Sequence, residues 1–93
     1  MARDYQKFKA LLEEQETFPL DYTFKFIGRN TPAFKQGVKE FEEKHPGLTL
    51  HVSRISSGGA HLALTYKVIA QTADVIIMIS DSIGEIQDVM VIL

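Results

Sequence analysis

Four side chains of the sequence have the chemistry to bind an anion together: Lys25, Arg29, His51 and Lys67. Lys25 and Arg29 lie on or just after an alternating segment that predicts a strand, while His51 and Lys67 lie on two later predicted strands. Cationic groups on neighbouring strands can hold a carboxylate or a phosphate through charge-assisted hydrogen bonds. We therefore predict a ligand site near the end of the first strand and on the open face of the sheet.

Arg29 and Asn30 also raise the possibility of hydrolysis, because acylphosphatases share the fold predicted below and use an arginine and an asparagine. The glycine-rich arginine loop of those enzymes is absent here. Ser80, Asp81 and Ser82 stand together on a predicted helix, but we expect their acidic and hydroxyl groups to be solvated. We predict no catalytic residues, with a small acylphosphatase-like hydrolase as the alternative.

The three histidines do not predict a metal site. His45 closes a helix, while His51 and His61 lie on the two arms of a predicted hairpin. With a three-residue turn, Ser57 would face His61 and Lys67 would face His51. The two rings would then be too far apart to share an ion with bonds of about 2 Å. We predict no metal and no cofactor.

The Gly58-Gly59 pair is a candidate for a phosphate-binding loop, because backbone amides in such loops can surround an anion. Phosphate loops, however, join a strand to the first turn of a helix. This pair joins two antiparallel strands, so we interpret it as the turn of a hairpin.

The composition and charge of the chain argue against several classes of partner and site. The net charge of −2 and the pI of 5.9 give no basic surplus for a nucleic-acid backbone. The open face offers no aromatic ring for base stacking, so we expect no nucleic-acid partner. Without cysteine there are no disulfides or thiolate sites. The apolar run Val75 to Ile79 is far shorter than the roughly 20 residues that span a bilayer. We expect no membrane partner and a cytoplasmic location.

The elements that must position these groups follow from periodicity and turn signals. Thr31 and Pro32 mark the start of a helix, and His45-Pro46-Gly47 marks its end. The predicted helices cover residues 4–15, 32–44 and 72–84, and the predicted strands cover 21–27, 48–56, 61–71 and 89–93.

This order predicts an α+β fold, a ferredoxin-like β-α-β-β-α-β sandwich preceded by an extra N-terminal helix. Two helices should cover one face of a four-stranded antiparallel sheet with strand order 4-1-3-2. We assign residues 1–17 to the helical appendage and residues 18–93 to the ferredoxin-like domain.

Two features predict an interaction surface. On the last helix, Ile77 and Met78 turn towards a charged side, and the last strand, with Val89 and Val91, is an unguarded sheet edge. The open face is also half apolar, through residues 27, 55, 63 and 69. Two alternatives remain for what packs on this face: the N-terminal helix of the same chain, or a second copy of the chain.

Several segments resemble the YbeD-like family of small bacterial proteins, which have an ACT-like, ferredoxin-like fold and no accepted catalytic activity. The segments are Phe18-Pro19, residues 22–28 (YTFKFIG), residues 56–59 (SSGG), residues 83–86 (IGEI) and the ending Val91-Ile92-Leu93. The hairpin departs from the family pattern, since His61 stands at the usual tyrosine position and Ala63 at the usual serine position.

The resemblance implies a non-catalytic ACT-like module that acts by binding a protein or a small metabolite. A structural homodimer built on the last strand is a second possibility from the residues alone.

Overall fold

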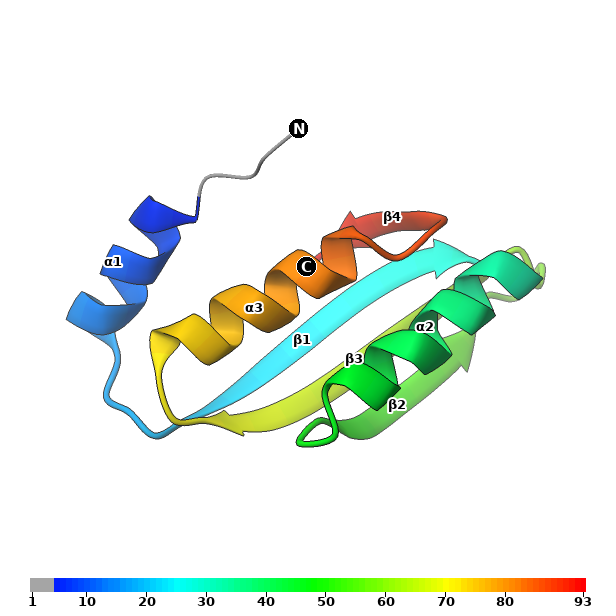
Figure 1. Ribbon diagram of the computed structural model, residues 1–93. Coiled ribbons are helices and arrows are strands. Elements are labelled where there is room, and N and C mark those ends of the chain that lie inside the picture. Colours follow the sequence, from blue (N-terminus) through cyan, green and yellow to red (C-terminus); the bar gives the residue numbers. More distant parts are fainter. Residues whose placement is uncertain (1–4) are drawn as a thin grey trace.

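The structure is a computed structural model that describes residues 5–93. Three helices and four strands follow one another along the chain (Figure 1). They are α1 (Gln6–Gln15), β1 (Leu20–Arg29), α2 (Pro32–Lys44), β2 (Thr49–Ile55), β3 (His61–Ala70), α3 (Ala73–Gly84) and β4 (Val89–Ile92). The predicted start of the first helix at Asp4 lies outside the described residues.

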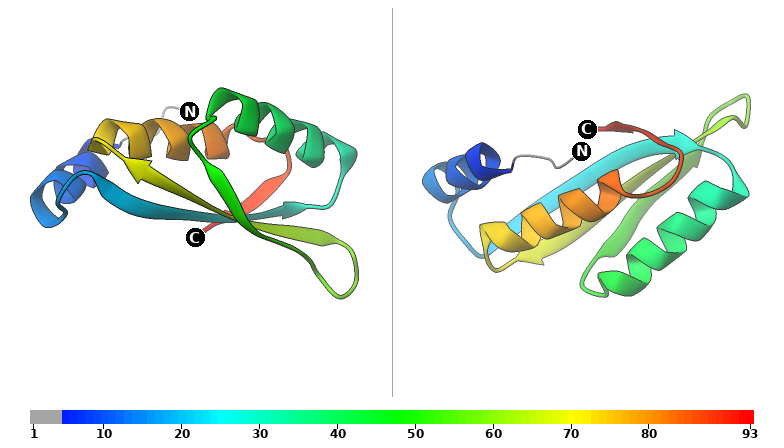
Figure 2. Two further views of the ribbon diagram at one scale, coloured as in Figure 1. Left: turned by 90° about the horizontal axis from the view of Figure 1, so that it is seen from below. Right: turned by 45° about the horizontal axis from the view of Figure 1, so that its top comes forward.

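The four strands form one antiparallel sheet in the order β2-β3-β1-β4. Read from the β4 edge, this is the 4-1-3-2 order that the sequence predicts. Helices α2 and α3 lie side by side on one face of the sheet (Figure 2). Within residues 5–93, no helix covers the opposite face, which we call the open face.

The junction of β1 and α2 forms as its residue types predict. Thr31 is extended, and its hydroxyl accepts a hydrogen bond from the Phe34 amide at 3.1 Å, while Pro32 begins the helix. The same hydroxyl donates to the Asp88 carboxylate at 2.7 Å. The helix cap is thereby connected to the loop that leads into β4.

Four aromatic rings form the centre of the core between α2 and the sheet. Phe26 stacks on Tyr66 with centroids 5.9 Å apart, and it meets Phe34 and Phe41 edge-on at 6.2 and 5.9 Å. Phe26 and Phe34 are completely buried. Alternation on β1 places Phe24 and Phe26 on this side of the sheet, as the sequence predicts.

Helix α1 does not cover the open face. It packs beside α3, where Leu12 is buried and Lys9 forms an ion pair with Asp74 at 3.0 Å (Figure 1). The intrachain covering that the sequence left open is therefore wrong for the described residues. The sequence of an amphipathic helix shows which side chains form its apolar stripe, but it does not show which surface that stripe packs against.

Strand β2 contains an extra residue at His51, which corrects two expectations. The register shifts between Leu50 and Val52, so Thr49 rather than His51 lies opposite Lys67. Leu50 and Val52 therefore point to opposite faces of the sheet. Ile55 lies opposite Leu62 on the helix side rather than on the open face.

The hairpin turn is also one residue longer than the turn considered from the sequence. Ser56, not Ser57, pairs with His61, since the Ser56 amide donates to the His61 carbonyl at 2.9 Å. Gly59 has a φ of 78°, a conformation that glycine adopts without strain.

We expect Tyr66→Phe to reduce the loss of stability at alkaline pH. The Tyr66 hydroxyl donates to Glu42 Oε2 at 2.6 Å, and burial, followed by this hydrogen bond, raises the pKa of the phenol far above its ordinary value. Because the folded pKa exceeds the unfolded value of about 10, the stabilisation is complete below about pH 10 and is lost as the pH rises further.

Thermal melts followed by circular dichroism across this range test the prediction. The melting temperature of the wild type should fall more steeply above about pH 10 than that of Tyr66→Phe, which at neutral pH should be less stable by about 1 kcal/mol. Parallel pH profiles for the two proteins would contradict it.

Candidate functional site

The register of the sheet defines which side chains share the open face. On β1 these are the odd-numbered residues from Asp21 to Arg29, because the even-numbered residues from Tyr22 to Gly28 face the helices. Pairing then places Ala63 and Lys67 of β3 and Arg54 of β2 on the open face. On β4, Val91 joins them opposite Ile27.

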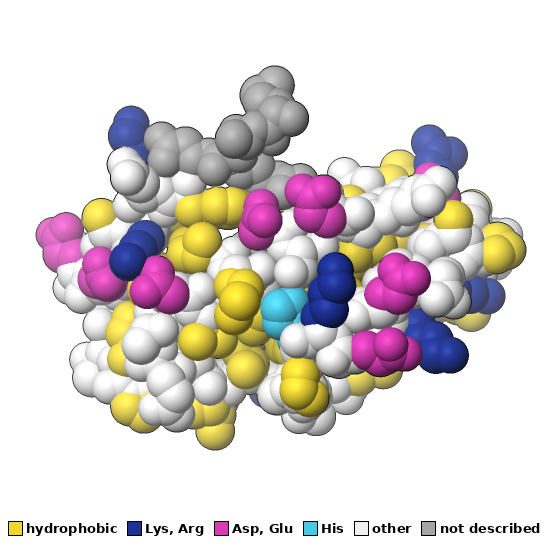
Figure 3. Space-filling model, in the orientation of Figure 1, with side chains coloured by type: hydrophobic (Ala, Val, Ile, Leu, Met, Phe, Trp, Pro, Cys, Tyr) yellow, Lys and Arg dark blue, Asp and Glu magenta, His cyan; other side chains and the backbone are white. Residues whose placement is uncertain are grey.

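Charge is distributed unequally between the two layers. The strands carry four Lys or Arg side chains, and all four lie on the open face: Lys25, Arg29, Arg54 and Lys67. The strands have one carboxylate, Asp21, which lies at the far end opposite Ile69. The three helices carry five lysines against seven carboxylates, and acidic side chains are prominent on the helix-covered side (Figure 3). The open face is thus cationic in a chain whose net charge is −2.

An apolar hollow lies on the open face at the hairpin end of the sheet. Its apolar residues are Ile27, Ala63, Met90 and Val91, and its volume is about 430 Å³. The remaining residues around it are Arg54, Ser56 and His61. Met90 and Val91 are 49% and 43% exposed, so the apolar surface is open to a ligand. We call these seven residues the hollow.

The structure separates the four predicted ligand residues into two groups. Lys25 lies opposite Thr65 and Lys67 opposite Thr23, so the two lysines are diagonal neighbours in the middle of the open face. Arg29 lies opposite His61, four residues along β1 from Lys25, or about 13 Å away. His51 occupies the bulge of the edge strand β2.

Sequence reasoning missed Arg54 and His61 as site residues. Without the bulge, alternation places Ile55 rather than Arg54 on the open face, so the register shift hid this arginine. A signal for His61 was present, because it stands where the YbeD-like pattern has a tyrosine. Both residues border the hollow beside Ala63.

The four predicted interface residues do not form one surface. Ile77 and Val89 are partly buried and pack against the core. Met78 is 56% exposed on α3, on the helix layer, whereas Val91 borders the hollow on the opposite side of the sheet. Of the four, Val91 alone belongs to the open face.

Comparison with known families provides the identification. The sequence profile of a family described as protein of unknown function (DUF493) matches residues 13–93. The chain belongs to this DUF493 family. The match confirms the resemblance to YbeD-like proteins. No curated protein and no solved structure matches the chain.

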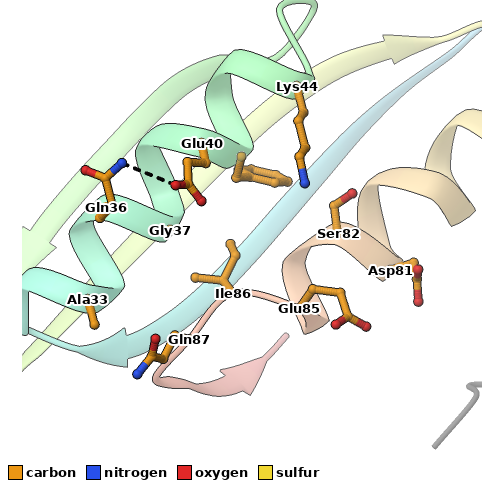
Figure 4. A pocket seen from close by; sticks show the side chains of 11 residues that line it. Ala33, Gln36, Gly37, Glu40, Lys44, Asp81, Ser82, Glu85, Ile86 and Gln87 are labelled. Carbon is orange, nitrogen blue, oxygen red and sulfur yellow. Dashed lines mark hydrogen bonds between the residues drawn. The ribbon is translucent and has the colours of Figure 1, made fainter.

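The DUF493 chain has a second hollow region, a groove between α2 and α3 with a volume of about 540 Å³. Figure 4 shows its mixed polar and apolar lining, which includes Lys44 from α2 and Glu85 just after the end of α3. Gln36 donates to the Glu40 carboxylate across one helical turn at 3.3 Å. Gly37 allows α2 to approach the loop that follows α3, because a Cβ there would lie 3.0 Å from Ile86.

His45, at the end of α2, contacts two residues that line this groove. Its Nε2 lies 2.9 Å from the Ser82 hydroxyl and its ring contacts Phe41 with centroids 5.2 Å apart. Burial, and then the charge of Lys44, lowers the pKa of His45 below its ordinary value. The bond connects the end of α2 to α3.

Two negative findings concern the described residues alone. Among residues 5–93, no three His, Cys, Asp or Glu side chains are grouped so that they could hold a metal ion. No helix in the same range is both long enough and apolar enough to cross a membrane.

Proposed function

We propose that this DUF493 protein is a non-catalytic binding module and that the open face of its sheet is the recognition surface. In this proposal the fold is of the ferredoxin-like, ACT-like type, and the module acts in the cytoplasm on a protein partner or a small metabolite. The observation that carries the proposal is the hollow, an accessible apolar surface beside cationic side chains. Binding sites commonly combine an apolar surface with a few polar groups that orient the ligand.

The open face is a better candidate than the groove between α2 and α3. The groove is lined by Ser82, which contacts His45, and by Gly37, which lies against Ile86, so its residues connect α2 to α3 and to the loop that follows α3. The side chains of the open face make no such contacts with the helix layer, and Ile69 is 67% exposed there. A surface without a structural role inside the domain is free to meet a partner.

The surroundings of Asn30 support a role without catalysis. Its side-chain nitrogen donates to the Gly59 carbonyl at 3.0 Å, and its backbone amide donates to the Ala60 carbonyl at 3.0 Å. An acylphosphatase-like role would need this amide group for a substrate, whereas here it holds the hairpin. The hydrolase alternative is therefore less well supported than binding.

Native mass spectrometry of protein purified gently from cells tests the proposal. We expect a bound molecule or partner that is retained by the wild type and lost or weakened in the Lys25→Ala, Arg54→Ala, Lys67→Ala triple variant, which removes the cation of the hollow as well as the two lysines in the middle of the open face. The matched control is Lys39→Ala on α2, an exposed lysine on the other side of the domain, which should retain the ligand.

The measured mass also shows whether the bound partner is a second copy of the chain or a small ligand. A twofold mass that the open-face variant leaves intact would favour a homodimer built on β4 and would contradict recognition through the open face. Equal retention of a small ligand by all three proteins would contradict it as well.

A further inference from the structure

We infer that the hollow binds a small amphipathic organic anion, with its carboxylate or phosphate group at Arg54 and its apolar part over Ile27, Ala63, Met90 and Val91. This inference rests on the proposed function, since it names the ligand class of the same open face. The ligand is identified by chemistry alone: a small molecule with one anionic group and a short apolar body.

The size and lining of the hollow favour a small molecule. A volume of about 430 Å³ lies within the range of small-molecule sites, roughly 300 to 1,000 Å³. Four apolar side chains from three strands form a continuous surface, because Ile27 lies between Ala63 and Val91 in the register. The burial of a ligand's apolar part against this surface supplies the main attraction.

The charged groups near the hollow select the sign of the ligand. Arg54 lies opposite Ala63, and Arg29 lies opposite His61, so both guanidinium groups start from positions next to the apolar surface. Neither arginine is in an ion pair within residues 5–93. The sole strand carboxylate, Asp21, is at the other end of β1. A guanidinium group can pair with a carboxylate or phosphate through two parallel hydrogen bonds.

The hairpin that carries Arg54 and His61 is held in place before any ligand binds. Asn30 donates twice to the hairpin turn, to the carbonyls of Gly59 and Ala60. The Ser56 hydroxyl accepts a hydrogen bond from the His61 amide at 3.1 Å. A site that is already ordered loses less conformational entropy on binding.

The same charges argue against a second copy of the chain on this surface. Two open faces packed against one another would bring eight Lys and Arg side chains together with two Asp21 carboxylates. Like charges at an interface cost free energy and disfavour the pairing. An anionic ligand pairs with the positive charges of the open face, whereas a second copy would bring like charges against them.

Titrations with four molecules that share a hexyl chain test the inference: hexanoate, hexyl phosphate, hexan-1-ol and hexylamine. Amide shifts in the two-dimensional NMR spectrum of the ¹⁵N-labelled protein report where each molecule binds. We expect the anions to shift Ile27, Ala63 and Val91, and hexanoate to bind at least about fivefold tighter than hexan-1-ol. Hexylamine should bind more weakly than hexan-1-ol, and added salt should weaken the binding of the anions alone.

One variant and its control show where the anionic group of the ligand binds. Arg54→Ala should reduce the affinity for hexanoate by about fivefold and leave that for hexan-1-ol unchanged. Lys39→Ala is the control and should change neither. The comparison of hexanoate with hexyl phosphate shows which anionic group the site prefers.

The outcomes separate this inference from the proposed function. Equal affinities for the anionic, neutral and cationic molecules, with shifts on the open face, would overturn the anion selectivity and leave the open face as the binding surface. Shifts confined to the α2–α3 groove, or no open-face shifts with any of the four, would overturn the inference that the hollow is a ligand site.

Discussion

Phe26→Ala is expected to lower the free energy of unfolding by about 3–5 kcal/mol, the usual cost of removing a buried phenylalanine. Phe26 is completely buried and contacts Phe34, Phe41 and Tyr66, with centroids 5.9–6.2 Å apart. Its loss removes the stacked pair with Tyr66 and two edge-on pairs, and it leaves a cavity beneath α2. Domains of this size commonly have only about 5–15 kcal/mol of stability in total.

Urea unfolding followed by circular dichroism measures the effect of Phe26→Ala. The control is Ile69→Ala, which removes a large apolar side chain that is 67% exposed on the open face. We expect a change below about 1 kcal/mol for the control, since little packing is lost. Similar losses for the two variants would show that the four-ring cluster is not the centre of the core.

The parts of the fold that could be predicted are those where several local signals agree. On β1, strict alternation of aromatic and polar residues coincides with burial of Phe24 and Phe26. At α2, Thr31 and Pro32 gave the start of the helix correctly, and His45-Pro46-Gly47 gave its end. Agreement between periodicity and capping leaves few alternative structures.

Strand β2 shows why other parts could not be predicted. All seven of its residues are exposed, so no buried face fixes their alternation. The extra residue at His51 then reverses the faces of the residues that follow. This shift brings Arg54 to the open face and Ile55 to the helix side, contrary to the alternation read from the sequence.

The candidate site could likewise be predicted only in part from the sequence. Lys25 and Lys67 could be placed together because β1 and β3 pair in continuous register. Their relation to Arg54 depends on the bulge, and the hollow also needs Met90 and Val91 from β4. Pairing between strands distant in sequence, including the irregularity between β1 and β4 next to Gly28, is a tertiary property.

Gly28→Ala is expected to be strongly destabilising because the helix that follows β1 packs directly on this glycine. Gly28 is buried on the helix side of the sheet, and a Cβ there would overlap the ring of Phe34. The ring is completely buried and meets Phe26 edge-on, so it cannot move without disturbing the core. We expect a loss of about 3 kcal/mol, at the upper end of the usual cost of overpacking.

A second change tests whether the overlap with Phe34 is the cause. In the Gly28→Ala, Phe34→Leu double variant, the smaller side chain leaves room for the new methyl group. The combined loss should then be at least about 1 kcal/mol less than the sum of the two single losses. The control is Gly58→Ala in the hairpin turn, where a Cβ would meet nothing within 4 Å and the change should be within about 0.5 kcal/mol. Additive losses would mean that the cost at Gly28 arises from the backbone of β1 rather than from its contact with α2.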